Sequence, residues 1–460
     1  MPITGPTRRH FLQATSLTAA LDMPRPAAPQ QNPTRRDTAK ISLNVREFGA
    51  KGDGTVKDTA AIQQTIDRCS AFGGGEVVIP AGNYLTGALA LRSGTFLRLD
   101  RDTSIIGTAD FADYPVTQVR WEGKWIQGHT GLFYAIGARN FGIHGPGKIV
   151  GNPALGGRPT RESPLRHPAL IEPIGCEDFI FEDFSTSYHL MWSIHPTNCR
   201  NIVIRNLTIR STGGNGDGID IDSSKHVRIE NCDIATGDDC ISIKSGRGME
   251  GYTLAQVSED VLITGCTMAD SIFACIGIGS ETSGGIRDVR IERCKFTGAR
   301  TFAIYIKSRP GRGAFIEDIA ADDIDVSGTA GGFLSLNILS SGIQDPAPVP
   351  GDEGIPTVKN FRFSNVRMKD CPVLVDAVRI HPDKPLDGFT LRDVTGTCAK
   401  GISLANVKNA ELKDVHVTGF SGPLIGVHNV SGSGTEGAAQ IDGPKVPDPV
   451  PAPPQPYRLR

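Results

Sequence analysis

The sequence predicts an all-β protein built as a solenoid of stacked coils. Short runs rich in valine, isoleucine and phenylalanine alternate with glycine, asparagine, aspartate and serine, and the 460 residues include 54 glycines. This composition, with few amphipathic helical windows, favours many short strands joined by turns. The segment Asn201–Ile209 also recurs in altered form, and its main apolar residue falls at positions 179, 202, 227, 261 and 289. An irregular repeat of this length is typical of a β-solenoid, in which neighbouring coils pair as parallel strands.

The first 36 residues are predicted to lie outside the fold. Thr7–Leu12 contains an Arg-Arg pair, and a mildly apolar stretch follows from Phe11 to Met23. This arrangement resembles a twin-arginine export signal, and a disordered basic N-terminus is the alternative. We therefore expect an exported protein, periplasmic or extracellular, in which 1–36 are the signal and a disordered segment.

A helix is predicted at the start of the fold, over Thr59–Cys69, with Asp58 as its N-cap. Its apolar side would be formed by Ala61, Ile62, Ile66 and Cys69. A solenoid has open ends, so an amphipathic helix laid across the first coil would cover one of them. Glu76–Pro80 is expected to begin the first strands.

One solenoid domain is expected over residues 43–430, followed by a flexible tail at 431–460 that is rich first in glycine and then in proline. The net charge of −2 gives no sign of a nucleic-acid partner. The sequence contains no run of 18 apolar residues, so we expect no membrane span. We expect a monomer.

Ten cysteines in an exported protein would normally suggest disulfides, but five of them are predicted to be core residues instead. When the repeats are aligned, Cys232, Cys266 and Cys294 share a column with leucine, valine and phenylalanine from other coils. Cys240 and Cys275 share a second column. A column that accepts all these residue types points inward, where cysteine acts as a small apolar side chain.

Two segments about one repeat apart carry the candidate chemistry, at 216–222 and 237–244. Each contains a short strand pattern, and aligning the two patterns places Ile219 beside Ile241 and Ile221 beside Ile243. The same alignment crowds together the carboxylates of Asp217, Asp238 and Asp239. Carboxylates this close are costly unless they share a proton, bind a cation or perform acid–base chemistry. This cluster predicts an enzyme.

An outward column is expected beside the three carboxylates. It is predicted to contain His195, Asp222, Lys244, Gly279 and Lys307 from successive coils. A mixture of acidic and basic side chains on adjacent coils suits the binding of a polar, charged carbohydrate.

These residues resemble glycoside hydrolase family 28, the polygalacturonases and their relatives, from about Asn44 to Ile425. The motifs that carry the resemblance are Asn44–Gly54, Asn215-Gly216-Asp217, Gly237-Asp238-Asp239-Cys240, Ile243-Lys244-Ser245-Gly246, Tyr305-Ile306-Lys307 and Gly311-Arg312-Gly313. The resemblance implies a right-handed parallel β-helix that cleaves galacturonate-containing pectic polysaccharide or oligosaccharide.

The resemblance also implies roles for the acids. Asp238 would be the general acid, while Asp217 and Asp239 would hold and activate the attacking water. It implies inversion at the anomeric carbon, which is typical of acid and base groups about 6.5–9.5 Å apart. Neither a metal nor a cofactor is expected. The side chains expected to bind substrate are Asn215, His195, Lys244, Glu281, Tyr305, Lys307 and Arg309.

Two positions depart from the family pattern. Ala274 stands where the family has a histidine, and Tyr305 stands where it has an arginine that binds the galacturonate carboxylate. A phenol cannot replace a bidentate arginine contact, although Arg309 or Arg312 could reach the site instead. We therefore expect a substrate other than plain polygalacturonan, with rhamnogalacturonan and xylogalacturonan as candidates.

Two alternatives stay open from the sequence. In a pectate-lyase-like enzyme, clustered aspartates would bind Ca²⁺ and Lys244 or Lys307 would act as the base. The second alternative is a non-catalytic β-helical protein that binds polysaccharide. Calcium dependence would identify the first, and binding without turnover the second.

Overall fold

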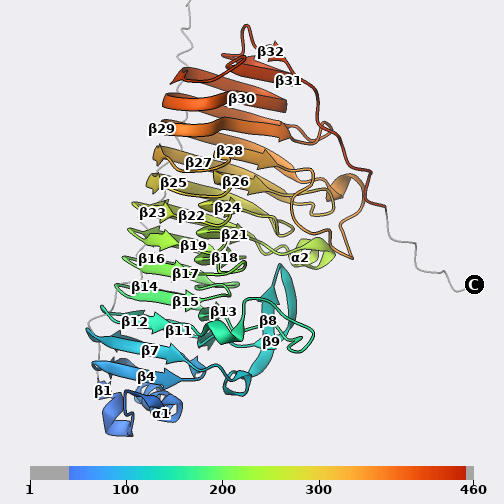
Figure 1. Ribbon diagram of the computed structural model, residues 1–460. Helices are drawn as coiled ribbons and strands as arrows, with labels where there is room; N and C mark the ends of the chain where they lie inside the picture. Colours follow the sequence, from blue (N-terminus) through green and yellow to red (C-terminus); the bar gives the residue numbers. More distant parts are fainter. Residues whose placement is uncertain (1–40, 452–460) are drawn as a thin grey trace, which may run out of the picture.

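The computed structural model describes residues 41–451, which form a right-handed parallel β-helix (Figure 1). Its coils stack along one axis, from the N-terminal coil beside α1 (Thr59–Ala71) to β32 (Ala439–Gln440) at the opposite end. The predicted all-β solenoid is confirmed. The expected export signal at 1–36 and residues 452–460 lie outside the described part.

Most coils contribute one strand to each of three parallel stacks, which we name the first sheet, the second sheet and the site sheet. The first sheet begins with β1 (Ser42–Asn44), β3 (Gly75–Ile79), β6 (Thr95–Leu99), β11 (Arg139–His144), β14 (Glu177–Glu182), β16 (Arg200–Arg205), β19 (Lys225–Glu230) and β22 (Ser258–Thr264). The second begins with β2 (Asp53–Lys57), β4 (Gly82–Thr86), β7 (Thr103–Gly107), β12 (Lys148–Val150), β15 (Ser185–His189), β17 (Thr208–Ser211), β20 (Asp233–Ala235) and β23 (Thr267–Ala269). The site sheet contains β5 (Leu89–Ala90), β10 (Phe133–Ile136), β13 (Ile171–Ile174), β18 (Ile219–Asp222), β21 (Ile241–Lys244), β24 (Ile276–Ile278), β26 (Phe302–Lys307) and β28 (Gly332–Asn337).

In the later coils, single long strands turn from one sheet into the next. These are β25 (Ile286–Phe296), β27 (Phe315–Val326), β29 (Thr357–Arg379) and β30 (Leu386–Thr418), and β31 (Ile425–Ser433) follows them. Short 3₁₀ helices occur at Val45–Phe48, Phe111–Asp113, Pro153–Leu155 and Gly351–Gly354.

The recurring segment found in the sequence sets the register of the first sheet. Phe179 pairs with Ile202, Ile202 with Val227, Val227 with Val261, and Val261 with Val289. The predicted alignment is confirmed at every one of these steps, and the paired side chains are buried.

Polar residues of the repeat occupy positions where the backbone is left-handed. The first residue of the segment has a left-handed conformation in coil after coil, with φ of 58° at Asn201, 57° at His226, 55° at Asp260 and 54° at Asp288. The sixth does the same, with φ of 55° at Asn206. Asparagine and aspartate tolerate this conformation better than other residues with a side chain, so the turns require the residue types that the repeat supplies.

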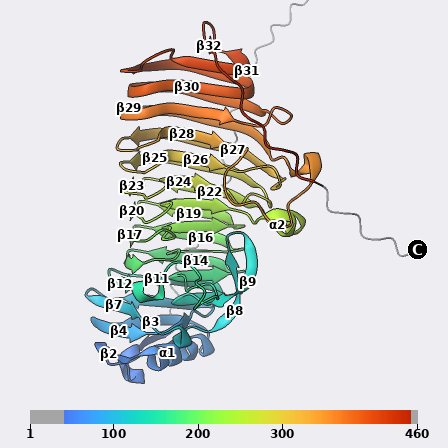
Figure 2. The ribbon, with the colours of Figure 1, turned by 45° about the vertical axis from the view of Figure 1, so that its right-hand side comes forward.

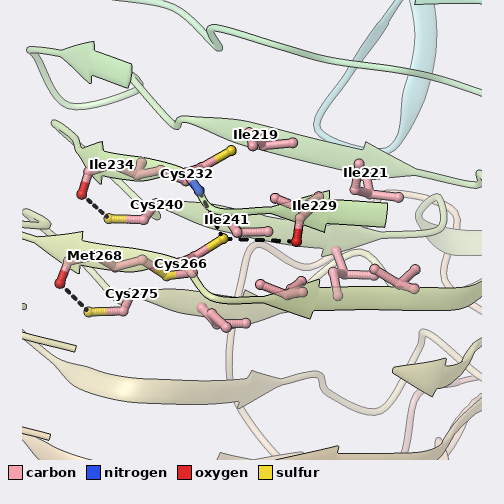
Figure 3. Close-up of a cluster of buried hydrophobic side chains, with 14 of the residues drawn as sticks. Ile219, Ile221, Ile229, Cys232, Ile234, Cys240, Ile241, Cys266, Met268 and Cys275 are labelled. Carbon is pink, nitrogen blue, oxygen red and sulfur yellow. Dashed lines mark hydrogen bonds between the residues drawn. The ribbon is translucent and has the colours of Figure 1, made fainter. Parts of the chain in front are cut away.

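Cysteines continue the apolar ladder of the interior (Figure 3). The Cys232 backbone N–H donates to Cys266 Sγ at 3.4 Å, and the thiol of Cys240 donates to the Ile234 carbonyl at 3.7 Å. All ten cysteines are buried and free, which confirms the prediction for the five in the two inward columns and extends it to the other five.

The N-terminal cap differs in detail from its prediction. Helix α1 forms as expected, but Asp58 makes no side-chain bond to the helix. Its carboxylate accepts the backbone N–H groups of Lys51 and Gly52, at 2.6 and 2.9 Å, and so fastens the preceding turn. The expectation that Glu76–Pro80 begins the first strands is wrong, because β1 and β2 precede it and β1 pairs with β3.

The C-terminal boundary also needs correction. The predicted limit at 430 falls inside β31, and residues 439–440 of the expected flexible tail pair with β31 as β32. The chain then runs along the outside of the coils, where the Gly351 N–H donates to the Val450 carbonyl at 3.1 Å. Residues 439–441 therefore belong to the stacked coils, since the Ile441 N–H also donates to the Val427 carbonyl.

A hairpin interrupts the stacking. Strands β8 (Val116–Trp121) and β9 (Lys124–His129) pair antiparallel and stand on the same side of the solenoid as α2 (Gly248–Leu254) (Figure 2). The Arg247 N–H donates to the Gly123 carbonyl at 3.0 Å, which fastens the hairpin turn to the segment before α2. Within 41–451, no helix is long and apolar enough to cross a membrane.

Candidate active site

The three candidate carboxylates lie just before the starts of two neighbouring strands of the site sheet. Asp217 precedes β18, and Asp238 and Asp239 precede β21. The predicted pairs Ile219–Ile241 and Ile221–Ile243 are confirmed. One oxygen of each carboxylate lies within 4.8 Å of the others, so the predicted crowding is confirmed as well.

Two glycines make room for this cluster. A Cβ on Gly277 would lie 2.3 Å from Asp239 Oδ2, and a Cβ on Gly237 would lie 2.0 Å from the Gly213 carbonyl oxygen. Neither position tolerates a side chain unless the backbone or the carboxylate moves. The glycines therefore let two coils approach closely enough to bring the acids together.

Asp238 is the partly exposed member of the three, whereas Asp217 and Asp239 are buried. Burial, and then the charges of Asp217 and Asp239, raise the pKa of Asp238 to about 8. The Asp239 N–H donates to Asp238 Oδ1 at 2.9 Å and fixes its orientation. Asp238 is thus a carboxylic acid that keeps its proton at neutral pH.

Asp239 is held on both oxygens. Lys307 Nζ lies 2.9 Å from Oδ2, and the Ala274 N–H donates to Oδ1 at 3.1 Å. Burial raises the pKa of the Asp239 carboxyl, and the Lys307 ammonium works against this rise. At the position where the family pattern has a histidine, Ala274 thus contributes its backbone.

Lys244 joins Asp217 to a fourth carboxylate that the sequence analysis did not select. Its Nζ lies 3.4 Å from Asp217 Oδ2 and 2.5 Å from Asp220 Oδ1. Burial, and then the neighbouring Asp217, hold the pKa of Asp220 well above its usual range. The signal for Asp220 was present, because it alternates with Ile219 and Ile221 and so must point away from the core.

An open pocket surrounds the acids. Of the residues predicted for the site, Asn215, Asp217, Asp238, Asp239, Lys244, Glu281 and Lys307 line it. Gly279 of the predicted outward column also lines it, and the pocket is completed by Glu122, Arg158, Trp192, Ser242 and Ser280, which the sequence analysis missed. Glu122 sits at the turn of the β8–β9 hairpin, which follows no repeat and therefore gave no register from which to place it.

His195 is not at the pocket, and the predicted column is wrong at this residue. Ile194 pairs with Ile219, so His195 aligns with Asp220, while Thr197 stands opposite Asp222. No regular strand forms at 194–197, and the four bridges made there by Ile194 and Thr197 are isolated. The sequence alignment could not fix the register of so short a contact.

The buried His195 ring lies behind the pocket wall. Its Nδ1 is 3.5 Å from Glu172 Oε1, and its ring centroid is 4.5 Å from that of Trp192, which lines the pocket. His195 is therefore a support for Trp192, and the prediction that it binds substrate needs correction.

Tyr305 and Arg309 do not line the pocket either. Tyr305 is partly exposed beside it, with its ring stacked on Phe273. Arg309 donates to the Gly342 carbonyl at 2.6 Å, and Arg312 is buried and donates to the Ser280 carbonyl at 2.9 Å. Both guanidinium groups thus donate to backbone carbonyl oxygens, and neither arginine lines the pocket.

Comparison with known proteins agrees with this geometry. A model of glycosyl hydrolases family 28 matches residues 69–335. A probable polygalacturonase of Vitis vinifera is 30% identical over 372 residues, which cover 77% of this chain and 74% of that protein. The structure of the Yersinia enterocolitica family 28 exopolygalacturonase has a TM-score of 0.72 at 20% identity, covering 87% of this chain and 79% of that one. A hyperthermoactive exopolygalacturonase of Thermotoga maritima has a TM-score of 0.64 at 24% identity, covering 81% and 92%.

At these identities the solved structures support the fold, and the family model and the grape relative support the assignment. They favour a glycosidase over the lyase and the non-catalytic binding protein that the sequence left open. The chain belongs to glycosyl hydrolases family 28 and is a glycosidase.

Proposed function

We propose that this glycosidase hydrolyses galacturonate-containing pectic polysaccharide or oligosaccharide, with inversion at the anomeric carbon and without a metal. The observation that carries the proposal is the state of Asp238, whose pKa is raised to about 8 by burial and by the acids on either side. A general acid must hold its proton at working pH and face the substrate, and Asp238 is the partly exposed member of the cluster.

In the proposed reaction, Asp238 gives its proton to the glycosidic oxygen as the bond from that oxygen to the anomeric carbon breaks. A water molecule attacks the same carbon from the opposite face, and its proton passes to Asp217 or Asp239. One new carbon–oxygen bond replaces the broken one, and the configuration inverts.

The spacing of the carboxylates favours a second candidate mechanism. One oxygen of each lies within 4.8 Å of the others, closer than the separation expected of an inverting pair. A retaining enzyme instead uses a carboxylate as the nucleophile, with its two groups roughly 5–5.5 Å apart. Against this route, both oxygens of Asp239 already accept hydrogen bonds, from Lys307 and the Ala274 N–H, which weakens it as a nucleophile.

Proton NMR of the first product anomer separates the two mechanisms. The proposal predicts that the first anomer released has the configuration opposite to that of the cleaved bond. Release of the same anomer as the cleaved bond would replace inversion by the retaining route.

Two positive charges next to the carboxylates support a reaction that needs no metal. The ammonium groups of Lys307 and Lys244 lie 2.9 Å from Asp239 and 3.4 Å from Asp217, and supply two positive charges to the cluster. A calcium ion bound by the same carboxylates would lie close to both lysines and be repelled by them.

The descriptions of the relatives and the polar lining of the pocket support a pectic substrate. The grape relative is described as a probable polygalacturonase and the two solved relatives as exopolygalacturonases. The pocket lining is mostly polar and charged, which suits a sugar chain. We also propose that residues 1–36 direct export of the protein and that it is a monomer.

The test measures product release from polygalacturonan, rhamnogalacturonan and xylogalacturonan, each with EDTA and with Ca²⁺. New reducing ends without ultraviolet absorbance of an unsaturated uronate, and insensitive to EDTA, are expected. Absorbance that disappears with EDTA would overturn the proposal in favour of a lyase. A matched Asp238→Asn protein, expected to release nothing, excludes contaminating activity.

A further inference from the structure

We propose that the surface next to the catalytic acids, on the side of β24 and β26, accepts an uncharged sugar unit and that Tyr305 and Phe273 select it. This inference rests on the proposed pectic substrate and states which of its units this surface takes. The shared chemistry is a sugar without a free carboxylate, supplied either by a methyl-esterified galacturonate or by a neutral sugar.

The first observation is a cluster of aromatic rings formed by Phe273, Phe302 and Tyr305. The Phe273 and Tyr305 ring centroids lie 5.8 Å apart with an interplanar angle of 22°, and Phe302 lies 5.9 Å from Tyr305. All three side chains are partly exposed. These side chains form a partly exposed apolar platform next to a polar pocket.

The second observation is that this aromatic cluster continues the pocket wall. Lys307 lines the pocket, and its Nζ lies 4.5 Å from the Phe273 ring centroid and 5.6 Å from that of Tyr305. In the site sheet, Tyr305 pairs with Gly277, which pairs with the pocket residue Ser242. Because Gly277 carries no side chain, nothing from its position projects between the pocket and Tyr305.

The third observation concerns charge. Among the described residues that line the pocket, five are acidic and three are basic. Each basic group is already paired with an acid. Lys244 lies 2.5 Å from Asp220, Lys307 lies 2.9 Å from Asp239, and Arg158 lies 3.4 Å from Glu122.

A free uronate at the aromatic cluster would add a negative charge beside a pocket whose acidic residues outnumber its basic ones, and each of the three basic side chains that line the pocket is already paired. Arg309 is not among the residues that line the pocket, and its Nη1 donates to the Gly342 carbonyl. An uncharged sugar avoids the repulsion, and its apolar C–H face can stack on the rings of Tyr305 and Phe273.

The test uses binding, so that it does not depend on turnover. Calorimetry with the Asp238→Asn protein compares three oligosaccharides of equal length: oligogalacturonate, its methyl ester, and a rhamnogalacturonan fragment. The inference predicts at least about tenfold tighter binding of one or both of the less charged oligosaccharides than of oligogalacturonate. Tighter binding of the methyl ester alone identifies a methyl-esterified unit, and tighter binding of the rhamnogalacturonan fragment alone identifies a neutral sugar.

Adding Tyr305→Ala or Phe273→Ala to that protein should weaken binding of the preferred oligosaccharide by about three- to tenfold and leave oligogalacturonate unchanged. Tyr305→Phe, which keeps the ring, should bind like the parent. Phe72→Ala is the control, because Phe72 is an exposed aromatic residue directly after α1 at the far end of the solenoid. Equal or tighter binding of oligogalacturonate, or an equal loss for all three ligands in Tyr305→Ala, would overturn the inference.

A second variant tests the charge argument in the active enzyme. Tyr305→Arg places a guanidinium beside the pocket and should raise kcat/KM on polygalacturonan relative to its methyl ester by about tenfold or more. An unchanged ratio would contradict the inference. If wild-type protein hydrolyses no pectic polymer, the proposed function fails, while the binding comparison still decides the inference.

Discussion

Lys307 Nζ lies 2.9 Å from Asp239 Oδ2, and both side chains are buried beside the partly exposed Asp238. The two residues come from β26 and from the turn before β21, 68 positions apart in the sequence. The pair favours different protonation states for the two neighbouring aspartates. Lys307 favours the charged form of Asp239, and the resulting negative charge favours the protonated form of Asp238.

Lys307→Met should shift the acidic limb of the activity profile to higher pH. Without the ammonium, the largest effect that opposes burial is lost, so the pKa of Asp239 rises further and the base is protonated over more of the acidic range. The pH dependence of kcat/KM measures the shift, expected to be about one unit or more. Lys225→Met is the control, since Lys225 is a partly exposed lysine at the surface, 3.7 Å from Glu259.

The same variant should be destabilised by about 3–5 kcal/mol near neutral pH, because it leaves a buried carboxylate without its partner. Urea unfolding at two pH values checks the cause. The loss should shrink at low pH, where Asp239 is protonated. An equal loss at both pH values would attribute it to packing.

Asp238→Asn should reduce kcat by roughly 10²–10⁴-fold, the usual contribution of a positioned general acid. The wild-type activity should also fall as pH rises through about 8, where Asp238 loses its proton. Asp233→Asn is the matched control, because Asp233 lies five residues earlier on the same coil and its side chain is 54% exposed in a surface ion pair with Arg210. Substantial remaining activity in Asp238→Asn would remove the general-acid assignment.

Much of this site could be predicted because strand register is a simple consequence of the repeat. Stacking Ile219 on Ile241 fixes the positions of Asp217 and Asp239, and continuing the same register over the following coils places Lys244 and Lys307 in one neighbouring column. Each inward step is enforced by an apolar side chain, since slipping by one residue would turn the whole set outward.

The remainder depends on contacts that no repeat encodes. The hairpin that brings Glu122 to the pocket is an insertion, and it is held by contacts with distant segments, among them the Arg247 N–H bond to the Gly123 carbonyl and the ion pair of Arg120 with Asp222. His195 was misplaced because its segment forms only isolated bridges. Tyr305 was predicted to bind substrate as a replacement for an arginine, but its stacking on Phe273 follows from packing between coils.

Asp238→Asn should also stabilise the fold at alkaline pH. The pKa of Asp238 is about 8 in the folded state and near 3.8 in the unfolded chain, so between these values the folded state binds more protons. The stability of wild type therefore falls as pH rises across this range, whereas the amide does not titrate. Thermal unfolding should show matching midpoints near pH 4 and a higher midpoint for Asp238→Asn near pH 9. A difference independent of pH would contradict the raised pKa.

Gly277→Ala tests whether the space beside Asp239 is needed for catalysis. The new Cβ would lie 2.3 Å from Asp239 Oδ2, so the carboxylate must move away from Lys307 and from the attacking water. A displacement of about 1 Å can cost on the order of 100-fold in rate, and we expect a loss of this size in kcat with a much smaller change in KM. Gly214→Ala is the matched control on the same face, because its Cβ meets nothing within 4 Å. If both variants keep full activity, the position of Asp239 does not limit the reaction, and Asp217 alone would have to hold the water.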